Sequence, residues 1–384
     1  MAEADPVFIS RRTAMSAVAD GPDWTLPTPP RTGCRVVPLI EAADMFPTLE
    51  HLVLDATNSV WLSFRIFDPE TATRSDRAKA MGLVDWASLI HHAVQRGVEV
   101  RILLADFEPV LADYLHAGSW HSFRRLRELV ASLPERSRDR LQLIVIQHEG
   151  EIGWCWRQLL RPLLRKRIRK LVEKLVRRGN NDDGGLDTRP GLWRHLAWED
   201  GKPTGWKPAP PPRLWPATYH QKFAVVDGKC AIIGGLDLDE RRWDDRRHRQ
   251  RANQTWHDIS ALIEGPAAED AARHFGRQWN RELPRYRLIV AEWTGPCGRE
   301  LMLDPLNEIP LIRKVPPVEG AAATVQLVRT LSRKSNSPFA IGPRHGIREL
   351  KAAHRSVITS AKRLLYIEAQ FFRSNPRPTG SRRR

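Results

Sequence analysis

A histidine and a lysine stand two residues apart in His220-Gln221-Lys222, directly ahead of the apolar run Phe223–Val226. The apolar run predicts a buried strand, and side chains two residues apart on a strand point to the same face. A phosphate over that face would meet an imidazole and an ammonium group together. Histidine titrates near neutral pH and can serve as a nucleophile or an acid, while lysine can neutralise a phosphate oxygen. The pair therefore predicts chemistry on a phosphodiester.

The residues after this strand predict how a phosphate is brought close to the backbone. Asp227 ends the apolar run and opens a turn with Gly228, so we expect it to support the motif structurally or electrostatically. The segment Gly234–Asp237 follows, and its first two residues, Gly234 and Gly235, permit a close backbone approach. We expect both glycines and Asp237 to lie at the substrate. Each feature alone is common, since Asp-Gly is an ordinary hairpin turn, but the combination is specific.

Together, the histidine, the lysine, Asp227 and the glycine pair resemble the first signature motif of the phospholipase D superfamily, and the likeness covers roughly residues 34–373. Five other segments follow the order found in its phospholipid-cleaving members: Arg96–Ala105, Asp239–Asp244, Trp256–Asp258, Gly265-Pro266 and Tyr366–Phe372.

This resemblance implies a pseudo-two-fold, bilobal α/β sandwich with one active site between the lobes, two histidines, and no metal or cofactor. It implies that His220 attacks phosphorus to form a phosphohistidine and that Lys222 holds the phosphate. A second histidine would protonate the leaving alcohol and later activate water. Asp258 occupies the place of the carboxylate that orients the opposite lobe's histidine, and we expect Gln370 to reach the cleft.

The alternation of apolar strands with helical stretches also favours an α/β sandwich. The strands that we expect are Ser59–Phe67, Val98–Ala105 and Leu141–Gln147, and the helices are Val84–Arg96, Phe123–Ser132 and Ala267–Trp279. Residues 179–212 are rich in Gly, Asn, Asp, Pro and Trp, and they predict a long irregular loop of the kind that forms lids and binding loops.

The chain contains an internal sequence repeat that predicts its domain organisation. Ala56–Phe67 aligns without gaps with Ala361–Phe372, and each segment follows a predicted helix, Leu49–Ala56 or His354–Ala361. We expect a mobile arm at 1–33, a first lobe at 34–290, a linker at 291–323 and the start of a second lobe at 324–384. Of the 13 histidines, only His220 has a lysine two residues later. We therefore expect the second lobe to stop before a second motif.

The net charge of +16 and the isoelectric point near 10.3 predict anionic partners, such as phospholipid headgroups or nucleic acid. Arg157–Arg178 predicts a basic amphipathic helix, preceded by Trp154 and Trp156. One interpretation places this helix on an anionic bilayer, and the alternative turns its apolar stripe toward the protein's own core. The four cysteines lack pairing or metal-ligand spacing, so we expect neither a disulfide framework nor a zinc site.

We expect a location in the cytoplasm or at a membrane surface, because neither a spanning segment nor a signal peptide is evident; secretion without a signal peptide stays open. The favoured function is hydrolysis of phosphatidylcholine-type lipids to phosphatidic acid and free headgroup. One alternative is a nuclease in which two copies of the single motif meet in a dimer, although lipid is favoured over nucleic acid. The other is an inactive remnant that binds anionic membranes.

Overall fold

The computed structural model describes residues 28–178, 185–200, 202–210, 213–251, 254–294, 306–310 and 314–369. Its strands are β1 Arg31–Ile40, β2 Ser59–Phe64, β3 Glu99–Ala105, β4 Leu141–Ile146, β5 Leu196–Glu199, β6 Lys202–Trp206, β7 Phe223–Val226, β8 Cys230–Gly234, β9 Ile259–Glu264, β10 Ala323–Val325, β11 Thr330–Arg333 and β12 Arg344–Arg348. Its α-helices are α2 Glu41–Asp55, α3 Asp76–Ala80, α4 Trp86–Gln95, α5 Asp113–Ser132, α6 Glu135–Arg138, α7 Trp154–Leu159, α8 Arg161–Arg178, α9 Pro266–Thr294 and α10 Glu349–Ser360. Short 3-10 helices cover Leu186–Thr188, Pro190–His195 and Glu240–Arg242.

One mixed sheet organises the described chain, with strand order β10-β1-β9-β8-β7-β2-β3-β4. Strands β2, β3 and β4 run parallel, and β7 is antiparallel to β2, with Ser63 opposite Phe223. The carboxyl end of β2 therefore lies beside the beginning of β7. This arrangement brings residues that follow β2 next to His220 and Lys222, although more than 150 residues of sequence separate them.

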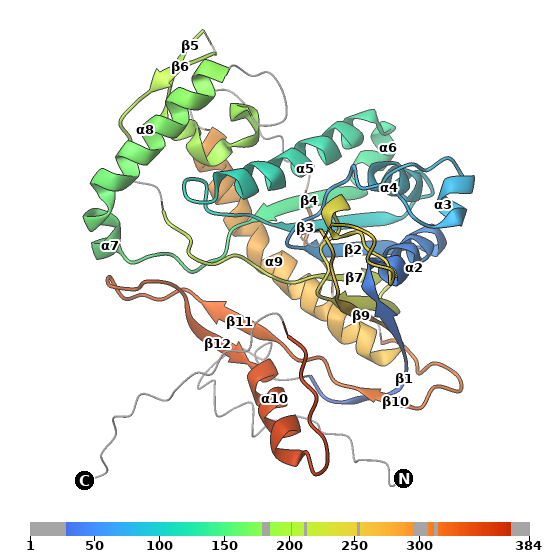
Figure 1. Ribbon diagram of the computed structural model, residues 1–384. Coiled ribbons are helices and arrows are strands. Elements are labelled where there is room, and N and C mark those ends of the chain that lie inside the picture. Colours follow the sequence, from blue (N-terminus) through green and yellow to red (C-terminus); the bar gives the residue numbers. More distant parts are fainter. Residues whose placement is uncertain are drawn as a thin grey trace, which may run out of the picture.

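Helices cover both faces of this sheet, with α9 on one face and α2, α4 and α5 on the other (Figure 1). Aromatic side chains in β2 and just after it pack against helices of both layers. Trp61 stacks on Phe275 of α9 at 5.4 Å between ring centroids. On the other face, Phe67, just after β2, meets Trp86 of α4 edge-on at 6.1 Å. The α/β architecture predicted from the sequence is thus confirmed.

The segment 179–212 differs from its prediction as an irregular loop. Its described residues contain two 3-10 helices and the hairpin β5–β6, in which Leu196 pairs with Trp206. The reason is that Leu196 is fully buried, in a second apolar cluster that lies apart from the sheet. The hairpin therefore has a packed face, and its residues are held by burial as well as by strand pairing.

The predicted basic helix is divided into α7 and α8, and the apolar stripe of α8 faces the protein's own core. Leu164, Ile168, Val172 and Leu175 are all buried in the same second cluster, against Leu192 and other apolar side chains. The alternative interpretation of this stripe is therefore correct, and a bilayer could meet only the remaining surface of α8. No helix in the described part of the chain is long and apolar enough to cross a membrane.

The C-terminal part of the described chain combines three small units. Strand β10 pairs with β1 at the edge of the large sheet, while β11 and β12 form a separate two-stranded sheet followed by α10. The helix predicted at His354–Ala361 is confirmed as α10. The strand expected after it is absent from 361–369, where Leu364 is 85% exposed and lacks a partner strand among the described residues. Residues 370–372 and most of the predicted arm at 1–33 lie outside the described ranges.

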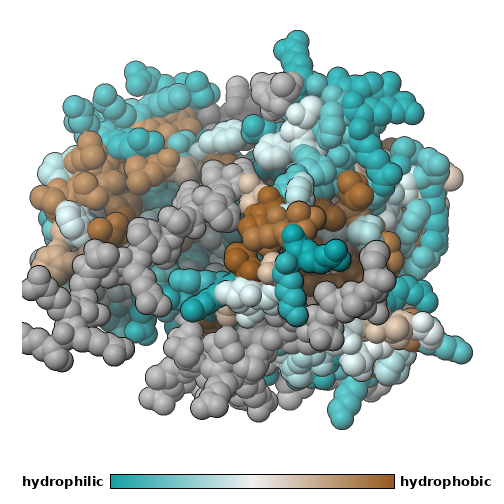
Figure 2. Space-filling view, turned by 60° about the horizontal axis from the view of Figure 1, so that its bottom comes forward, coloured by the Kyte–Doolittle hydropathy of each residue, from teal (hydrophilic) through white to brown (hydrophobic). Residues whose placement is uncertain are grey.

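Exposed apolar side chains gather in this C-terminal part. Figure 2 looks onto the underside of Figure 1, where α10 lies, and shows apolar surface beside hydrophilic residues. The exposed members in and after α10 are Leu350, Val357, Ile358, Leu364, Leu365, Tyr366 and Ile367.

Candidate active site

His220 and Lys222 lie just before β7 and point to the same side of the chain, as their spacing predicts. The Nζ atom of Lys222 lies 3.1 Å from Nδ1 of His220. The carbonyl oxygen of Lys222 accepts a hydrogen bond from the backbone N–H of Gly234, which continues the β7–β8 pairing up to the motif. His220 is exposed, whereas Lys222 is only 7% exposed. The imidazole is thus accessible to a ligand, and the ammonium group of Lys222 contacts it from the buried side.

Lys222 belongs to a cluster of three cations around the buried carboxylate of Asp237. Lys222 Nζ lies 3.8 Å from one carboxylate oxygen of Asp237, and that oxygen also accepts a hydrogen bond from the backbone N–H of Ile66. Nη1 of Arg65 and Nη2 of Arg242 each lie 3.9 Å from the other oxygen. Asp239 also lies 4.0 Å from Nε of Arg242. Two carboxylates thus face three positive charges, and the remaining positive charge favours an added anion.

The two arginines of this cluster retain hydrogen-bonding capacity. Nε of Arg65 and Nη1 of Arg242 are buried and have no hydrogen-bond partner among the described residues. The guanidinium of Arg242 lies over the ring of Trp256, 3.7 Å from its centroid, which holds the arginine in place. Buried donors without partners are uncommon in folded proteins, so both arginines have donors that are not used within the described structure.

The electrostatic environment favours the neutral, nucleophilic form of His220. Although one side of the ring is exposed, partial desolvation by the surrounding atoms, followed by the positive charges of Lys222 and Arg65, lowers the pKa of His220 from its ordinary value of 6.5. Burial also lowers the pKa of Lys222, and the negative charge of Asp237 opposes that shift. An unprotonated imidazole beside an ammonium group is the arrangement that attack on a phosphodiester requires.

Gly234 and Gly235 allow a neighbouring segment to approach, and Gly234 also lines a cavity together with His220 and Lys222. A Cβ atom on Gly234 would overlap the side chain of Ser260, and one on Gly235 would overlap the carboxylate of Asp258. The sequence predicts a close backbone approach at these glycines, and the group that approaches in the structure is protein. Asp258 is thereby held near the motif.

Asp258 is half-buried, and its negative charge opposes part of the lowering of the Lys222 pKa. Its carboxylate accepts a hydrogen bond from the backbone N–H of Ile259 at 2.8 Å, and its carbonyl oxygen accepts one from the backbone N–H of Glu41. Within the described ranges, no hydrogen bond or ion pair joins the Asp258 carboxylate to a histidine. The expected site residue Gln370 lies outside the described residues.

Asp227 lies at the opposite end of β7 from His220. Its carboxylate accepts hydrogen bonds from the backbone N–H groups of Thr57, Asn58 and Ser59, at 2.7–3.0 Å, and from the Thr57 hydroxyl. Burial alone would raise the pKa of Asp227, but these hydrogen bonds outweigh burial and lower it. Asp227 thus fastens the turn that precedes β2, and its position separates it from the reacting face.

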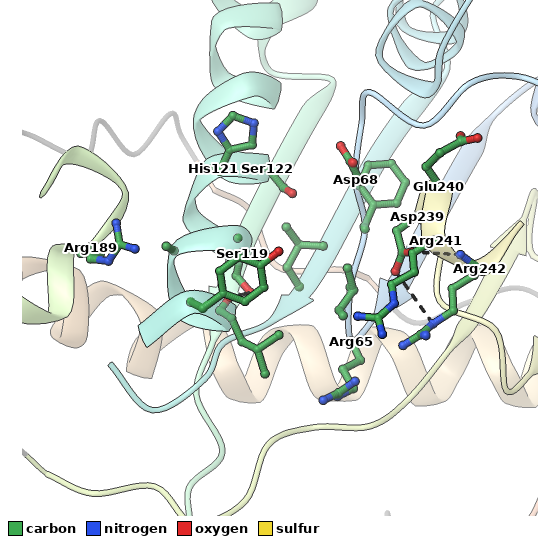
Figure 3. Close-up of a pocket in the computed structure, with 17 residues that line it drawn as sticks. Arg65, Asp68, Ser119, His121, Ser122, Arg189, Asp239, Glu240, Arg241 and Arg242 are labelled. Carbon is green, nitrogen blue, oxygen red and sulfur yellow. Dashed lines mark hydrogen bonds and ion pairs between the residues drawn. The ribbon is translucent and has the colours of Figure 1, made fainter. Parts of the chain in front are cut away.

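Two cavities adjoin the cation cluster. His220 and Lys222 line a cavity of about 200 Å³ whose opposite wall is the segment Leu327–Leu331. Arg65 and Arg242 line a larger cavity of about 570 Å³. Figure 3 shows Arg65, Arg241 and Arg242 on one side of it and Ser119, His121 and Ser122 of α5 on the other. The cluster therefore borders both spaces, and a phosphate bound there could extend into either.

The sequence interpretation did not identify Arg65 and Arg242. The available signal was Asp237, a charged residue in an apolar context, because a buried carboxylate needs nearby cations. Arg65 lies near the end of the predicted strand Ser59–Phe67, and Arg242 lies in a segment that the resemblance already included. The pairing of β2 with β7 brings Arg65 to the motif, and the distances to Asp237 show that Arg242 joins it.

Comparison with known proteins finds sequence similarity over part of the chain. Mouse phospholipase D1 is 34% identical over 164 residues, which are 42% of this chain and 13% of that protein. Arabidopsis thaliana phospholipase D beta 2 is 25% identical over 202 residues, covering 40% of this chain and 22% of that protein. The chain thus matches less than a quarter of the length of either relative. No family model matches it.

Among solved structures, Nuc from Salmonella typhimurium, titled a phospholipase D family member, aligns at a TM-score of 0.32 with 12% identity. The alignment covers 64% of this chain and 95% of that structure. NucT from Helicobacter pylori aligns at 0.30 with 10% identity, over 64% of this chain and 94% of that structure. At such low scores, the likeness adds nothing to what the sequence relatives show.

Proposed function

The chain belongs to the phospholipase D superfamily, and from this premise we propose that it is a phosphodiesterase acting on phosphatidylcholine-type phospholipids, with phosphatidic acid and free headgroup as products. One observation carries the proposal. The exposed imidazole of His220 lies 3.1 Å from a buried lysine, at a cation cluster whose arginines have unfilled donors. That set of groups suits a phosphodiester.

In the first step, a ring nitrogen of His220 attacks phosphorus, and a nitrogen–phosphorus bond forms as the bond from phosphorus to the headgroup oxygen breaks. Negative charge accumulates on the non-bridging oxygens in the transition state. Lys222, Arg65 and Arg242 are positioned to stabilise that charge, and their burial strengthens the effect. Removing one such donor typically reduces turnover by about 10²–10³-fold.

The leaving oxygen needs a proton, which the family resemblance assigns to a second histidine. His274 is the other histidine that lines the cavity of His220, but burial lowers the pKa of His274 to about 3. His274 is therefore neutral at pH 7 and has no imidazolium proton to donate. We propose that the acid is a histidine of an opposing lobe, carried by the same chain or by a second copy, and that Asp258 orients it.

In the second step, water attacks phosphorus, the nitrogen–phosphorus bond breaks, and phosphatidic acid leaves. The same group that protonated the headgroup now accepts a proton from this water, in accordance with microscopic reversibility. His220 returns to its neutral form. We expect Gln370 to contact the bound substrate, while Gly234, Gly235 and Asp237 shape the site around it.

A lipid substrate is favoured over a nucleic acid by the similarity to phospholipases and by the larger cavity. Apolar side chains of Phe67, Leu104 and Leu115 line that cavity together with the arginines. A mixed lining of this kind suits an amphiphile with a charged phosphate. A nuclease would also exploit the basic charge, and its binding would fall steeply with added salt.

The test is choline release from phosphatidylcholine vesicles by the purified protein, alongside hydrolysis of single-stranded DNA. We expect choline release that is abolished in His220→Ala, reduced about 10²–10³-fold in Lys222→Gln, and unchanged in the exposed control His354→Ala. Hydrolysis of DNA alone would support the dimeric nuclease instead. A folded protein that binds anionic vesicles without releasing choline would support the inactive remnant.

A further inference from the structure

Outside the proposed active site, two histidines converge on one buried glutamate. Nε2 of His248 lies 3.1 Å from a carboxylate oxygen of Glu41, and Nδ1 of His257 lies 3.2 Å from the same oxygen. All three ligand atoms lie within 4.8 Å of one another. Glu41 begins α2, and the two histidines come from the loop between β8 and β9. The chain thus assembles a two-nitrogen, one-oxygen set from distant segments.

The outer nitrogen of each histidine meets its own carboxylate. Nδ1 of His248 lies 2.9 Å from Asp244, and Nε2 of His257 lies 3.3 Å from Glu368. Histidines that bind metal ions almost always donate their other ring N–H to a carboxylate or carbonyl, which fixes the tautomer. Here both histidines follow that pattern, and in that tautomer each ring directs its lone pair toward Glu41.

Glu41 itself has two unusual features. It is only 2% exposed, and its second carboxylate oxygen, Oε2, has no hydrogen-bond partner among the described residues. Its φ angle is +64°, in the left-handed region that a residue with a Cβ rarely adopts. Strained residues of this kind persist where surrounding structure holds them and tend to cluster at functional sites. A buried carboxylate with a free oxygen, facing two imidazole nitrogens, is an arrangement that a cation would complete.

We infer that Glu41, His248 and His257 form a binding site for a divalent transition-metal ion, with Zn²⁺ as the best match. Zinc bonds of about 2.0–2.2 Å to nitrogen and oxygen, in tetrahedral geometry, place neighbouring ligand atoms roughly 3.3 Å apart. The 3.1 and 3.2 Å separations are close to this spacing. Two imidazoles favour zinc over magnesium or calcium, which prefer oxygen ligands. A fourth coordination position is left for water or another ligand.

The site would fasten the segment that carries Asp258. The backbone N–H of Glu41 donates a hydrogen bond to the carbonyl oxygen of Asp258, and His257 is its immediate neighbour in sequence. Asp244 also accepts a hydrogen bond from the backbone N–H of Trp256, which secures the same loop. A metal ion at Glu41 would thus join the start of α2 to this loop and stabilise both.

The metal-free protein, prepared with a chelator, is titrated with Zn²⁺ by calorimetry and with Co²⁺ by visible absorption. We expect one ion per chain, an intense tetrahedral Co²⁺ spectrum, and a higher thermal midpoint with Zn²⁺. His248→Gln and His257→Gln should abolish the spectrum, while the exposed control His51→Gln should keep it. Asp244→Asn, which leaves all three ligands in place, should weaken binding by roughly 10–100-fold.

The competing occupant of this space is a proton, which would make His248 an imidazolium shared between Asp244 and Glu41. In that case, the wild-type protein would show no tetrahedral Co²⁺ spectrum and would bind Zn²⁺ no more tightly than the double variant of His248 and His257. Either result would overturn the metal site. Both readouts are independent of phosphodiesterase activity, so they hold whatever the substrate is.

Discussion

The positive charges around His220 favour its neutral form and also favour the binding of an anionic ligand. Desolvation, followed by the charges of Lys222 and Arg65, lowers the pKa of His220, and Asp237 only partly offsets this lowering. The neutral imidazole is the form that can attack phosphorus. The same charges that keep it neutral also attract the phosphate, so one set of residues serves both purposes.

The pH dependence of activity tests this coupling. Because the pKa of His220 is lowered from 6.5, the nucleophile stays neutral until the pH falls through that lower value. We expect the acidic limb of the kcat/KM profile to lie below pH 6.5, since this profile reports groups of the free enzyme. In Arg65→Gln, one cation is lost, the pKa of His220 rises, and the limb should move to higher pH.

Arg136→Gln is the matched control for that experiment, because Arg136 is an exposed arginine of α6 and carries the same charge. Its profile should coincide with that of the wild-type protein. An acidic limb that stays in place in Arg65→Gln would show that His220 does not sense this cluster.

The sequence predicts part of this residue set and omits part of it, for a physical reason. The spacing of His220 and Lys222 follows from the two-residue period of an extended chain, and the structure confirms that the two side chains meet. Arg65 and Arg242 approach Asp237 only through strand pairing, which no local pattern specifies. The cluster at Glu41 was also missed, because the ligands of a metal site built from distant segments leave no spacing in the sequence.

At the scale of elements, the two ends of β7 carry residues with different roles. His220 precedes β7 and is the proposed nucleophile, whereas Asp227 follows β7 and stabilises a turn. Asp227 adopts a φ of +52° and accepts the N–H groups of the turn before β2. This turn sets the start of β2, and the other end of β2 leads to Arg65.

Asp227→Ala should therefore affect the free energy of unfolding more than the turnover rate. Loss of charge-assisted hydrogen bonds from a half-buried carboxylate should reduce the free energy of unfolding by about 1–3 kcal/mol at pH 7. Asn keeps one acceptor oxygen and tolerates the left-handed backbone, so Asp227→Asn should lose less. Urea denaturation measures both changes, and the turnover of folded protein should change little.

The pH dependence of that loss has a defined sign. The folded-state pKa of Asp227 is below its ordinary value of 3.8, so the stabilisation is present above that value and disappears as the pH falls through the folded pKa. The difference in stability between the wild-type protein and Asp227→Ala should therefore shrink in strong acid. A difference that grows on acidification would contradict this role.

Helix α8 shows how far an amphipathic pattern can be interpreted without a structure. The period of its apolar residues predicts a helix, which is confirmed, but it cannot distinguish a membrane from the protein's own core. Burial of Leu164 and Ile168 against Leu192 settles this question for the apolar stripe. The hairpin β5–β6 had a readable signal as well, because Asp200-Gly201 between its strands is a typical hairpin turn.

The exposed basic face of α8 remains our proposed contact with anionic membranes. Replacing Lys166, Lys170 and Lys174 together by Gln should weaken binding to anionic vesicles by about 1 kcal/mol per charge, or roughly fivefold each. All three are exposed, so thermal stability should be unchanged. Vesicle flotation measures the effect, and unaltered flotation would assign membrane binding to another surface.

Ile168→Ala provides the complementary variant on the same helix. This side chain is only 1% exposed, and its truncation should reduce stability by about 2–5 kcal/mol without removing a surface charge. Binding of its folded fraction to anionic vesicles should remain close to that of the wild-type protein. A selective loss of vesicle binding in this variant would indicate that the apolar stripe of α8 contacts the membrane.

At the scale of the whole molecule, a mixed sheet covered by helices on both faces places the motif where the carboxyl end of β2 meets the start of β7. Ligands of open α/β sheets bind beyond the carboxyl ends of the strands, and the cation cluster occupies such a position. The sequence predicted this architecture because strand and helix periods are local. The strand expected in the second copy of the internal repeat is absent from residues 361–369. A strand needs a neighbouring strand to pair with, and a local sequence pattern does not show whether one is present.

The most direct test of the central claim is to trap the covalent intermediate. The protein is mixed with a phosphatidylcholine analogue, quenched at alkaline pH, where phosphohistidine persists, and digested for mass spectrometry. We predict a phosphatidyl adduct on the peptide that contains His220, absent in His220→Ala and present in the control His354→Ala. Headgroup release without any adduct on His220, or release that persists in His220→Ala, would contradict the account.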